Sequence, residues 1–159
     1  MNLVYVALAM LGGMVMPIQA GMNRELGARL GSPLYATLNN FVGGTALMVV
    51  ACALAGAFGW ARFTPAGVSA APWWSWLGGV CGCTLVLTAT IAVSRIGSVG
   101  LVAAIVAGQL LCSLVVDQFG LLGHAVRAIT PTRVLGIGLL VAGVYLVQRD
   151  AGLGAPAGA

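Results

Sequence analysis

Long apolar stretches, separated by short polar or glycine- and proline-containing segments, make up most of this chain. The stretch at 98–121 is long enough to cross a bilayer as a helix, which takes roughly 20 residues. Four other stretches have a similar character. Because these runs are continuous and do not alternate with period two, they favour helices over the strands of a barrel. The pattern predicts five membrane-spanning helices, at 2–22, 33–56, 73–93, 98–121 and 132–149.

The segments between these runs carry the usual signals for helix ends. Ser32-Pro33 and Thr130-Pro131 each combine an N-cap residue with proline at the first helical position. Ser94–Gly97 is expected to form a tight turn, and the breakers in 57–72 predict the longest loop. We therefore expect one all-α integral membrane domain over 1–149, followed by a disordered Gly/Ala/Pro tail at 150–159.

The 98–121 span carries both a polar and a close-packing face. Gln109, Ser113 and Asp117 follow each other at i, i+4 and i+8, which places them on one helical face about 80° wide. A carboxylate well inside a span costs on the order of 2.5–3.5 kcal/mol on insertion scales, so it needs a partner or a function. The other face carries Gly100, Ala104 and Gly108 at four-residue spacing, a flat strip where another helix can approach closely. This span is therefore predicted to line a polar cavity.

Composition supports the membrane assignment. The chain is 60% hydrophobic and 6% charged, with a mean hydropathy of +1.05, whereas a soluble domain carries about 25% charged residues. The formal net charge is +4, and all seven basic residues are arginines scattered near predicted span ends. Such residues act as topology signals and headgroup contacts, so the lipid bilayer is the expected partner and nucleic acid is not.

No metal, cofactor or catalytic site is expected. The four cysteines fall within predicted spans, where a small apolar role is usual. Cys81 and Cys83 would point about 200° apart on a helix, which suits neither a metal nor a disulfide. His124 lies in a predicted loop without a partner in the sequence. With no nucleophile–base pair, the chain is not expected to be an enzyme.

The remaining polar residues within spans leave two interpretations open. Gln19 and Asn23, at i and i+4, can either bond each other or a neighbouring helix, or line a substrate cavity. Asn39 and Asn40 differ by 100° around their helix, so only one of them can face a given cavity. Asp117 can form an interfacial ion pair with Arg127 or Arg133, cap its helix, or act as a titrating coupling group.

Several short motifs occur in a fixed order along the chain: Gln19-x-x-x-Asn23, Gly31-Ser32-Pro33, Asn40-Phe41-Val42-Gly43-Gly44, Gly108-Gln109-Leu110, Asp117-Gln118-Phe119-Gly120 and Arg133-x-x-Gly136. Together with the five predicted spans, they resemble the short YdcZ-like family of the drug/metabolite transporter superfamily. The resemblance implies a five-helix half-transporter unit in a bacterial inner membrane. The glutamate that small multidrug resistance proteins carry in their first span is missing here, which favours a cavity lined by amides.

The leading hypothesis is a small secondary transporter for a small organic solute. A small dual-topology channel and a non-transporting membrane subunit are the alternatives. The substrate cavity is expected to include Gln19, Asn23, Asn39, Asn40, Gln109 and Ser113, with Asp117 as a possible coupling acid.

The distribution of arginines predicts an antiparallel homodimer. Five spans put the termini on opposite sides of the membrane, so the arginines divide four against three: Arg24, Arg29, Arg95 and Arg149 against Arg62, Arg127 and Arg133. This is almost no positive-inside bias, and a chain without bias is expected to insert in both orientations. Two opposed copies then reproduce the inverted repeats of larger transporters.

Overall fold

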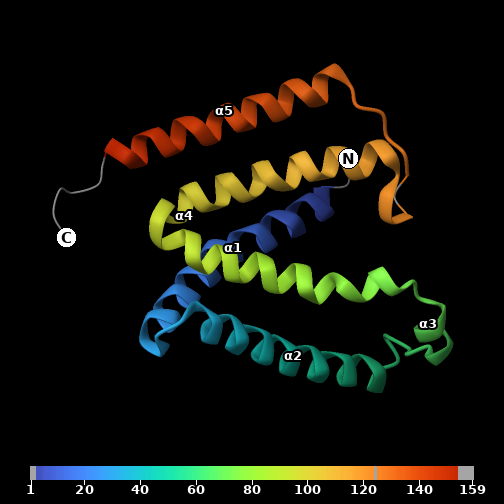
Figure 1. The fold of residues 1–159 in the computed structure, drawn as a ribbon. Coiled ribbons are helices and arrows are strands. Elements are labelled where there is room, and N and C mark those ends of the chain that lie inside the picture. The colour runs from blue at the N-terminus through green and yellow to red at the C-terminus, as the bar shows by residue number, and fades with distance from the viewer. Residues whose placement is uncertain (1–2, 124, 154–159) are drawn as a thin grey trace. The chain divides into compact units, whose positions relative to one another are not determined.

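The computed structural model describes residues 3–123 and 125–153, and every regular element within these ranges is helical. The elements are α1 (Leu3–Leu30), α2 (Pro33–Ala57), α3 (Pro65–Ala70), η1 (Trp73–Leu77), α4 (Gly78–Phe119), η2 (Leu121–Gly123) and α5 (Pro131–Leu153) (Figure 1). Within the described residues, α1, α2 and the 47-residue stretch Trp73–Phe119 are long and apolar enough to cross a membrane. Pro131–Leu146 is a shorter apolar segment. The expected all-α membrane fold is confirmed.

Helix α1 is longer than the sequence pattern predicts. We expected the span to end near residue 22 and a connection at 24–31, but the helix continues to Leu30 and includes Pro17. The polar segment is itself helical: the Arg29 Nε lies 2.8 Å from the Glu25 Oε1 at i, i+4. An arginine in the last turn also interacts favourably with the helix dipole. The helix stops before Gly31, whose φ of 78° is in the left-handed region.

The two predicted Ser/Thr-Pro helix starts are confirmed. The Ser32 hydroxyl accepts a hydrogen bond from the backbone N–H of Leu34 at 3.2 Å, with Pro33 at the first helical position of α2. Thr130 precedes α5 in the same way, and its hydroxyl lies 3.4 Å from the backbone nitrogen of Arg133. Each hydroxyl thus satisfies one backbone donor that has no partner within its helix.

The segment after α2 contains more helix than we expected. Pro65, interpreted as a loop breaker, is the first residue of the short helix α3, because proline is compatible with the first turn of a helix. The apolar run expected to begin as a span at 73 starts as the 3₁₀ helix η1 and becomes α-helical only at Gly78.

Helix α4 contains a break at one residue. We expected a turn over Ser94–Gly97, but the helix continues through Ile96, and only Gly97, with φ 70° and ψ 171°, leaves the helical region. That region of backbone space is essentially restricted to glycine. The stretch therefore consists of two helical segments that meet at Gly97. At the other end of the chain, α5 continues to Leu153, so part of the expected disordered tail is helical; 154–159 lie outside the described residues.

The chain divides into two compact units, which are described separately. The terminal unit contains α1 up to Gln19 and the described chain from Ala92 onward, and the middle unit contains Ala20–Ile91. Buried positions are few and mostly small, as expected where helices approach closely and the outer surface faces lipid. In the terminal unit they are Val93, Gly100 and Leu101; in the middle unit they are Ala20, Asn23, Gly27, Ala36, Thr37, Ala89 and Thr90.

Two glycines show how closely the helices of the middle unit approach. A Cβ atom built on Gly27 of α1 would lie 3.2 Å from the Pro33 Cα at the start of α2. A Cβ atom built on Gly82 of α4 would lie 3.4 Å from the ring of Phe41 in α2. The α1–α2 connection is therefore closed by a direct backbone contact, whereas α2 and α4 meet through an aromatic side chain.

Candidate functional site

A groove of about 350 Å³ in the terminal unit brings charged and polar groups together between two apolar helices. The groove contains one hydroxyl, from Ser113, one carboxylate, from Asp117, and one guanidinium, from Arg133. The spacing of three and four residues along each helix places these groups and their apolar neighbours on facing surfaces. The lining residues are Leu110, Ser113, Leu114 and Asp117 of α4 and Arg133, Gly136, Ile137 and Leu140 of α5.

Asp117 and Arg133 form an ion pair across this groove. The Arg133 Nη1 lies 3.3 Å from the Asp117 Oδ2, and the two side chains keep 37% and 29% of their surface exposed, respectively. This contact involves one oxygen and one nitrogen and is longer than the 2.7–2.9 Å typical of strong charge-assisted hydrogen bonds. The pair confirms one of the partners that the sequence left open for Asp117, and it leaves both charged groups accessible from the groove.

The loop after α4 is fastened to the end of that helix. The backbone N–H of Arg127 donates to the carbonyl of Asp117 at 2.8 Å. The backbone N–H of Ile129 donates to the Gln118 Oε1 at 2.9 Å. These two bonds satisfy acceptors near the helix C-terminus, where intrahelical partners run out. They also fix the start of α5, and with it Arg133, close to the carboxylate.

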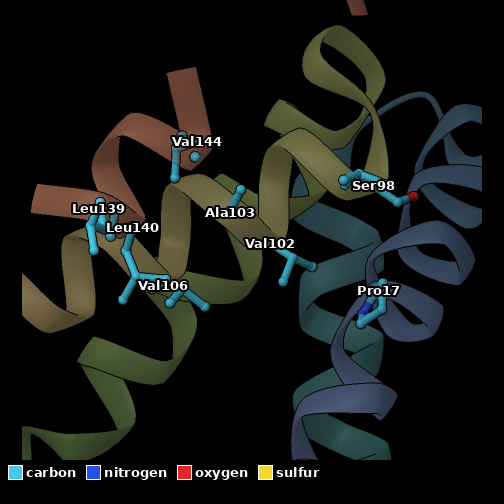
Figure 2. A pocket seen from close by; sticks show the side chains of 11 residues that line it. Pro17, Ser98, Val102, Ala103, Val106, Leu139, Leu140 and Val144 are labelled. Atoms are coloured by element: carbon cyan, nitrogen blue, oxygen red, sulfur yellow. The ribbon is translucent and has the colours of Figure 1, made fainter. Parts of the chain in front are cut away.

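The apolar part of the site is a larger cavity of about 540 Å³ that adjoins the groove at Leu140, which lines both. Val106 of α4 lies beside Leu140 of α5, and Val102 points towards Pro17 of α1 (Figure 2). Ser98 contributes the one side-chain hydroxyl among the lining residues. The charged pair therefore lies at one end of a long, otherwise apolar cleft.

Gln109, predicted to share the face of Asp117, does not line this groove. Its side chain is exposed, and its backbone carbonyl accepts the Ser113 hydroxyl at 2.7 Å. A serine that donates back to the preceding turn still offers its oxygen lone pairs to a ligand. Of the three residues on the predicted polar face, Ser113 and Asp117 thus line the groove and Gln109 does not.

The other predicted cavity residues are divided between the two units. Gln19 is half-buried in the terminal unit. Asn39 and Asn40 lie in the middle unit, where Asn39 is exposed and Asn40 lines a groove of about 620 Å³ along α2.

Asn23 occupies an unusual position in the middle unit. The residue is 6% exposed, and its Nδ2 has no hydrogen-bond partner among the described residues. A buried amide donor without a partner costs roughly 1–3 kcal/mol, so it calls for an explanation. The sequence indicates a polar residue in a span here, but it cannot indicate that the amide lacks a partner.

From the sequence, Arg133 was expected only as a possible partner of Asp117 and not among the cavity residues. The sequence did contain a signal for this position. Arg133 follows Pro131, which starts a helix, by two residues, so it must lie near the end of the preceding span. The four cysteines are free and exposed. Among the described residues, no three His, Cys, Asp or Glu side chains come together to hold a metal ion. His124 lies outside the described residues.

Comparison with known proteins identifies the family but not the substrate. No match was found among curated proteins or among solved structures. Residues 4–146, which include every residue that lines the groove and its ion pair, match the family described as "Putative inner membrane exporter, YdcZ". Because this match covers most of the chain, the protein belongs to this YdcZ family and is a multi-pass inner membrane protein.

Proposed function

We propose that this protein is a small secondary transporter that exports a small organic solute across the bacterial inner membrane. The observation that carries the proposal is the Asp117–Arg133 pair, which lies in the groove between two apolar helices with both side chains partly exposed. Charged groups within membrane helices are costly and mark substrate or ion pathways as a rule. The description of the family as a "Putative inner membrane exporter" supports outward transport.

A five-span topology is part of this proposal. A continuous helix over the 47 residues of Trp73–Phe119 would be about 70 Å long, more than twice the hydrocarbon core of a bilayer, roughly 30 Å. The non-helical backbone of Gly97 divides this stretch into two segments of spanning length. With α1, α2 and α5, the chain would then cross the membrane five times.

The working unit in this proposal is an antiparallel homodimer that operates by alternating access. The near-equal division of arginines between the two sides gives the chain no preferred orientation. Two opposed copies are related by a two-fold axis in the membrane plane, and their sites exchange roles when access switches. Of the residues expected to line the cavity, Ser113 would contact the solute in the groove, and Asp117 would be the coupling acid.

Efflux from proteoliposomes tests the transport function. The purified protein is reconstituted in vesicles loaded with a metabolite extract, and mass spectrometry follows which solutes leave. We expect saturable loss of a small set of solutes, which a matched Asp117→Asn/Arg133→Gln variant abolishes. This variant removes both charges together: asparagine keeps the shape of aspartate, and glutamine leaves a shorter, neutral polar side chain in place of arginine. Single-channel currents, or no solute-specific loss, would refute a transporter.

A single cysteine in the C-terminal tail, in a background without the four native thiols, tests the orientation separately. A membrane-impermeant reagent is expected to label about half of the population in intact cells. Labelling of nearly all or nearly none of the population would show one fixed orientation and exclude the antiparallel homodimer.

A further inference from the structure

The cleft between α4 and α5 combines a charged end with a long apolar body. The 350 Å³ groove around Asp117 and Arg133 and the 540 Å³ apolar cavity adjoin at Leu140. As residue numbers fall along α4 from Asp117 to Val99, they rise along α5 from Arg133 to Val144. The two helices are therefore antiparallel along the cleft, and its polar groups gather at the end where α4 stops and α5 starts.

The depth of this cleft matches half of a bilayer. Arg133 is the third residue of α5, and Val144 follows it eleven residues later. At 1.5 Å per residue, the two positions are about 16 Å apart along the helix axis, or roughly half of a 30 Å hydrocarbon core. A ligand with its head at the charged pair would therefore extend its apolar part towards the middle of the membrane.

The charges of Asp117 and Arg133 determine which kind of head group can bind at this end of the cleft. Asp117 and Arg133 carry opposite charges that cancel, so a head with a net charge would gain little from the site as a whole. Among the described residues, the guanidinium has one side-chain contact, to the Asp117 Oδ2, which leaves four of its five N–H donors and the Asp117 Oδ1 for a ligand. A head with both an anionic and a cationic group can bind the two residues at once.

The apolar residues that line the cleft determine what the rest of the ligand can be. The larger cavity is lined by valine, leucine, alanine, glycine and proline, with the Ser98 hydroxyl at the far end from the ion pair. Its volume of about 540 Å³ is within the 300–1,000 Å³ range of sites for drug-sized ligands. A single hydrocarbon chain attached to a small head matches this combination of size and polarity.

We propose that the solute of this protein is a single-chain zwitterionic amphiphile, whose head binds between Asp117 and Arg133 and whose chain lies along the apolar cleft towards Pro17. The inference rests on the proposed transport function and specifies its substrate class. It commits to a free solute as the occupant. A bilayer phospholipid shares the zwitterionic chemistry, and the test below separates the two sources.

Binding to the full-length protein in nanodiscs is measured as a shift of the melting temperature, which a ligand raises when it binds only the folded state. The probes share an eight-carbon chain: octanoylcarnitine is zwitterionic, octyltrimethylammonium is cationic and octanoate is anionic. Carnitine provides the head with no chain. At ten times its dissociation constant, octanoylcarnitine is expected to raise the melting temperature by about 3–6 °C. The other three probes are expected to bind at least tenfold more weakly.

Two variants locate the binding site. Asp117→Asn/Arg133→Gln is expected to remove the preference for the zwitterion, and Ala103→Phe, which fills the apolar cavity, is expected to remove binding of octanoylcarnitine. Leu111→Phe is the matched control, because Leu111 lies on the same helix and is exposed outside both cavities. The melting temperature without ligand shows whether each variant is folded; if Ala103→Phe does not fold, Ala107→Leu replaces it.

Three results would overturn the inference: equal or tighter binding of a singly charged probe, an unchanged preference in the double variant, or no shift with any probe. A shift seen in phosphatidylglycerol nanodiscs but lost in phosphatidylcholine nanodiscs would assign the cleft to a bilayer lipid and overturn it too. Solute-specific efflux from proteoliposomes without octanoylcarnitine binding would leave the proposed transport function standing while this inference fails.

Discussion

Replacement of Gly97 by alanine tests the helix break on which the five-span topology depends. At φ 70° and ψ 171°, Gly97 occupies a region that costs a residue with a side chain about 1–3 kcal/mol. No atom lies within 4 Å of the position that its Cβ would take, so steric overlap adds nothing. Alanine also lowers the conformational entropy of the unfolded chain, which stabilises the folded state by about 0.4–1 kcal/mol. Gly97→Ala should therefore destabilise the fold by roughly 0.5–2.5 kcal/mol.

The matched control is Gly108→Ala, because Gly108 is in the same helix, also has open space around its Cβ position, and shows no positive φ. Alanine should stabilise this helical position by about 0.5–1 kcal/mol. In a mild detergent, the melting temperature should fall by about 1–10 °C for Gly97→Ala and rise by about 1–4 °C for Gly108→Ala, from 2–4 °C per kcal/mol for a chain of this size. If Gly97→Ala melts as high as Gly108→Ala, the backbone at residue 97 is helical and the two-segment interpretation of α4 is wrong.

Four further predictions follow from particular contacts. Gly27→Ala should destabilise the protein by about 1–3 kcal/mol, because its Cβ would lie 3.2 Å from backbone atoms of Pro33; Gly21→Ala, with open space, should not, and equal melting of the two variants would contradict the close approach. Asn23→Ala should change the stability by less than about 1 kcal/mol, since it removes an unpaired buried donor; a loss above about 2 kcal/mol would show that the amide is paired. Asp117→Asn should melt like the parent protein but lose any pH dependence of transport, and an unchanged pH profile would remove its coupling role. Alkylation of the unfolded protein under non-reducing conditions should modify all four cysteines; fewer would reveal a disulfide.

Local chemistry accounts for the parts of the fold that could be predicted from sequence. The starts of α2 and α5 follow from a hydroxyl followed by proline, a signal confined to two residues. The continuation of α1 to Leu30 was missed because a polar segment after an apolar run resembles a loop, whereas Arg29 and Glu25 at i, i+4 stabilise helix. The sequence indicated an interruption over Ser94–Gly97, but it could not indicate that only Gly97 leaves the helical region, since its φ depends on how the chain continues.

In the site, too, features set by residues close in sequence could be predicted, whereas contacts between distant residues could not. Helical periodicity places Ser113 and Asp117 on one face, and both line the groove. The same periodicity includes Gln109, which does not line it. The choice of Arg133 over Arg127 as the partner of Asp117 depends on the path of the intervening loop, where Arg127 is held by its backbone N–H instead.

The loop between α4 and α5 is attached to Asp117 through the main chain and not through the carboxylate. The Arg127 N–H binds the Asp117 carbonyl, while the carboxylate binds only Arg133 among the described residues. The side chain can therefore exchange partners without release of the loop. Rotation of a partly exposed side chain takes picoseconds to nanoseconds, whereas loop motions take nanoseconds to microseconds. Capture of a charged group at this position would then proceed at the speed of a rotamer change, and slower helix motions would be left to determine the rate of each transport cycle.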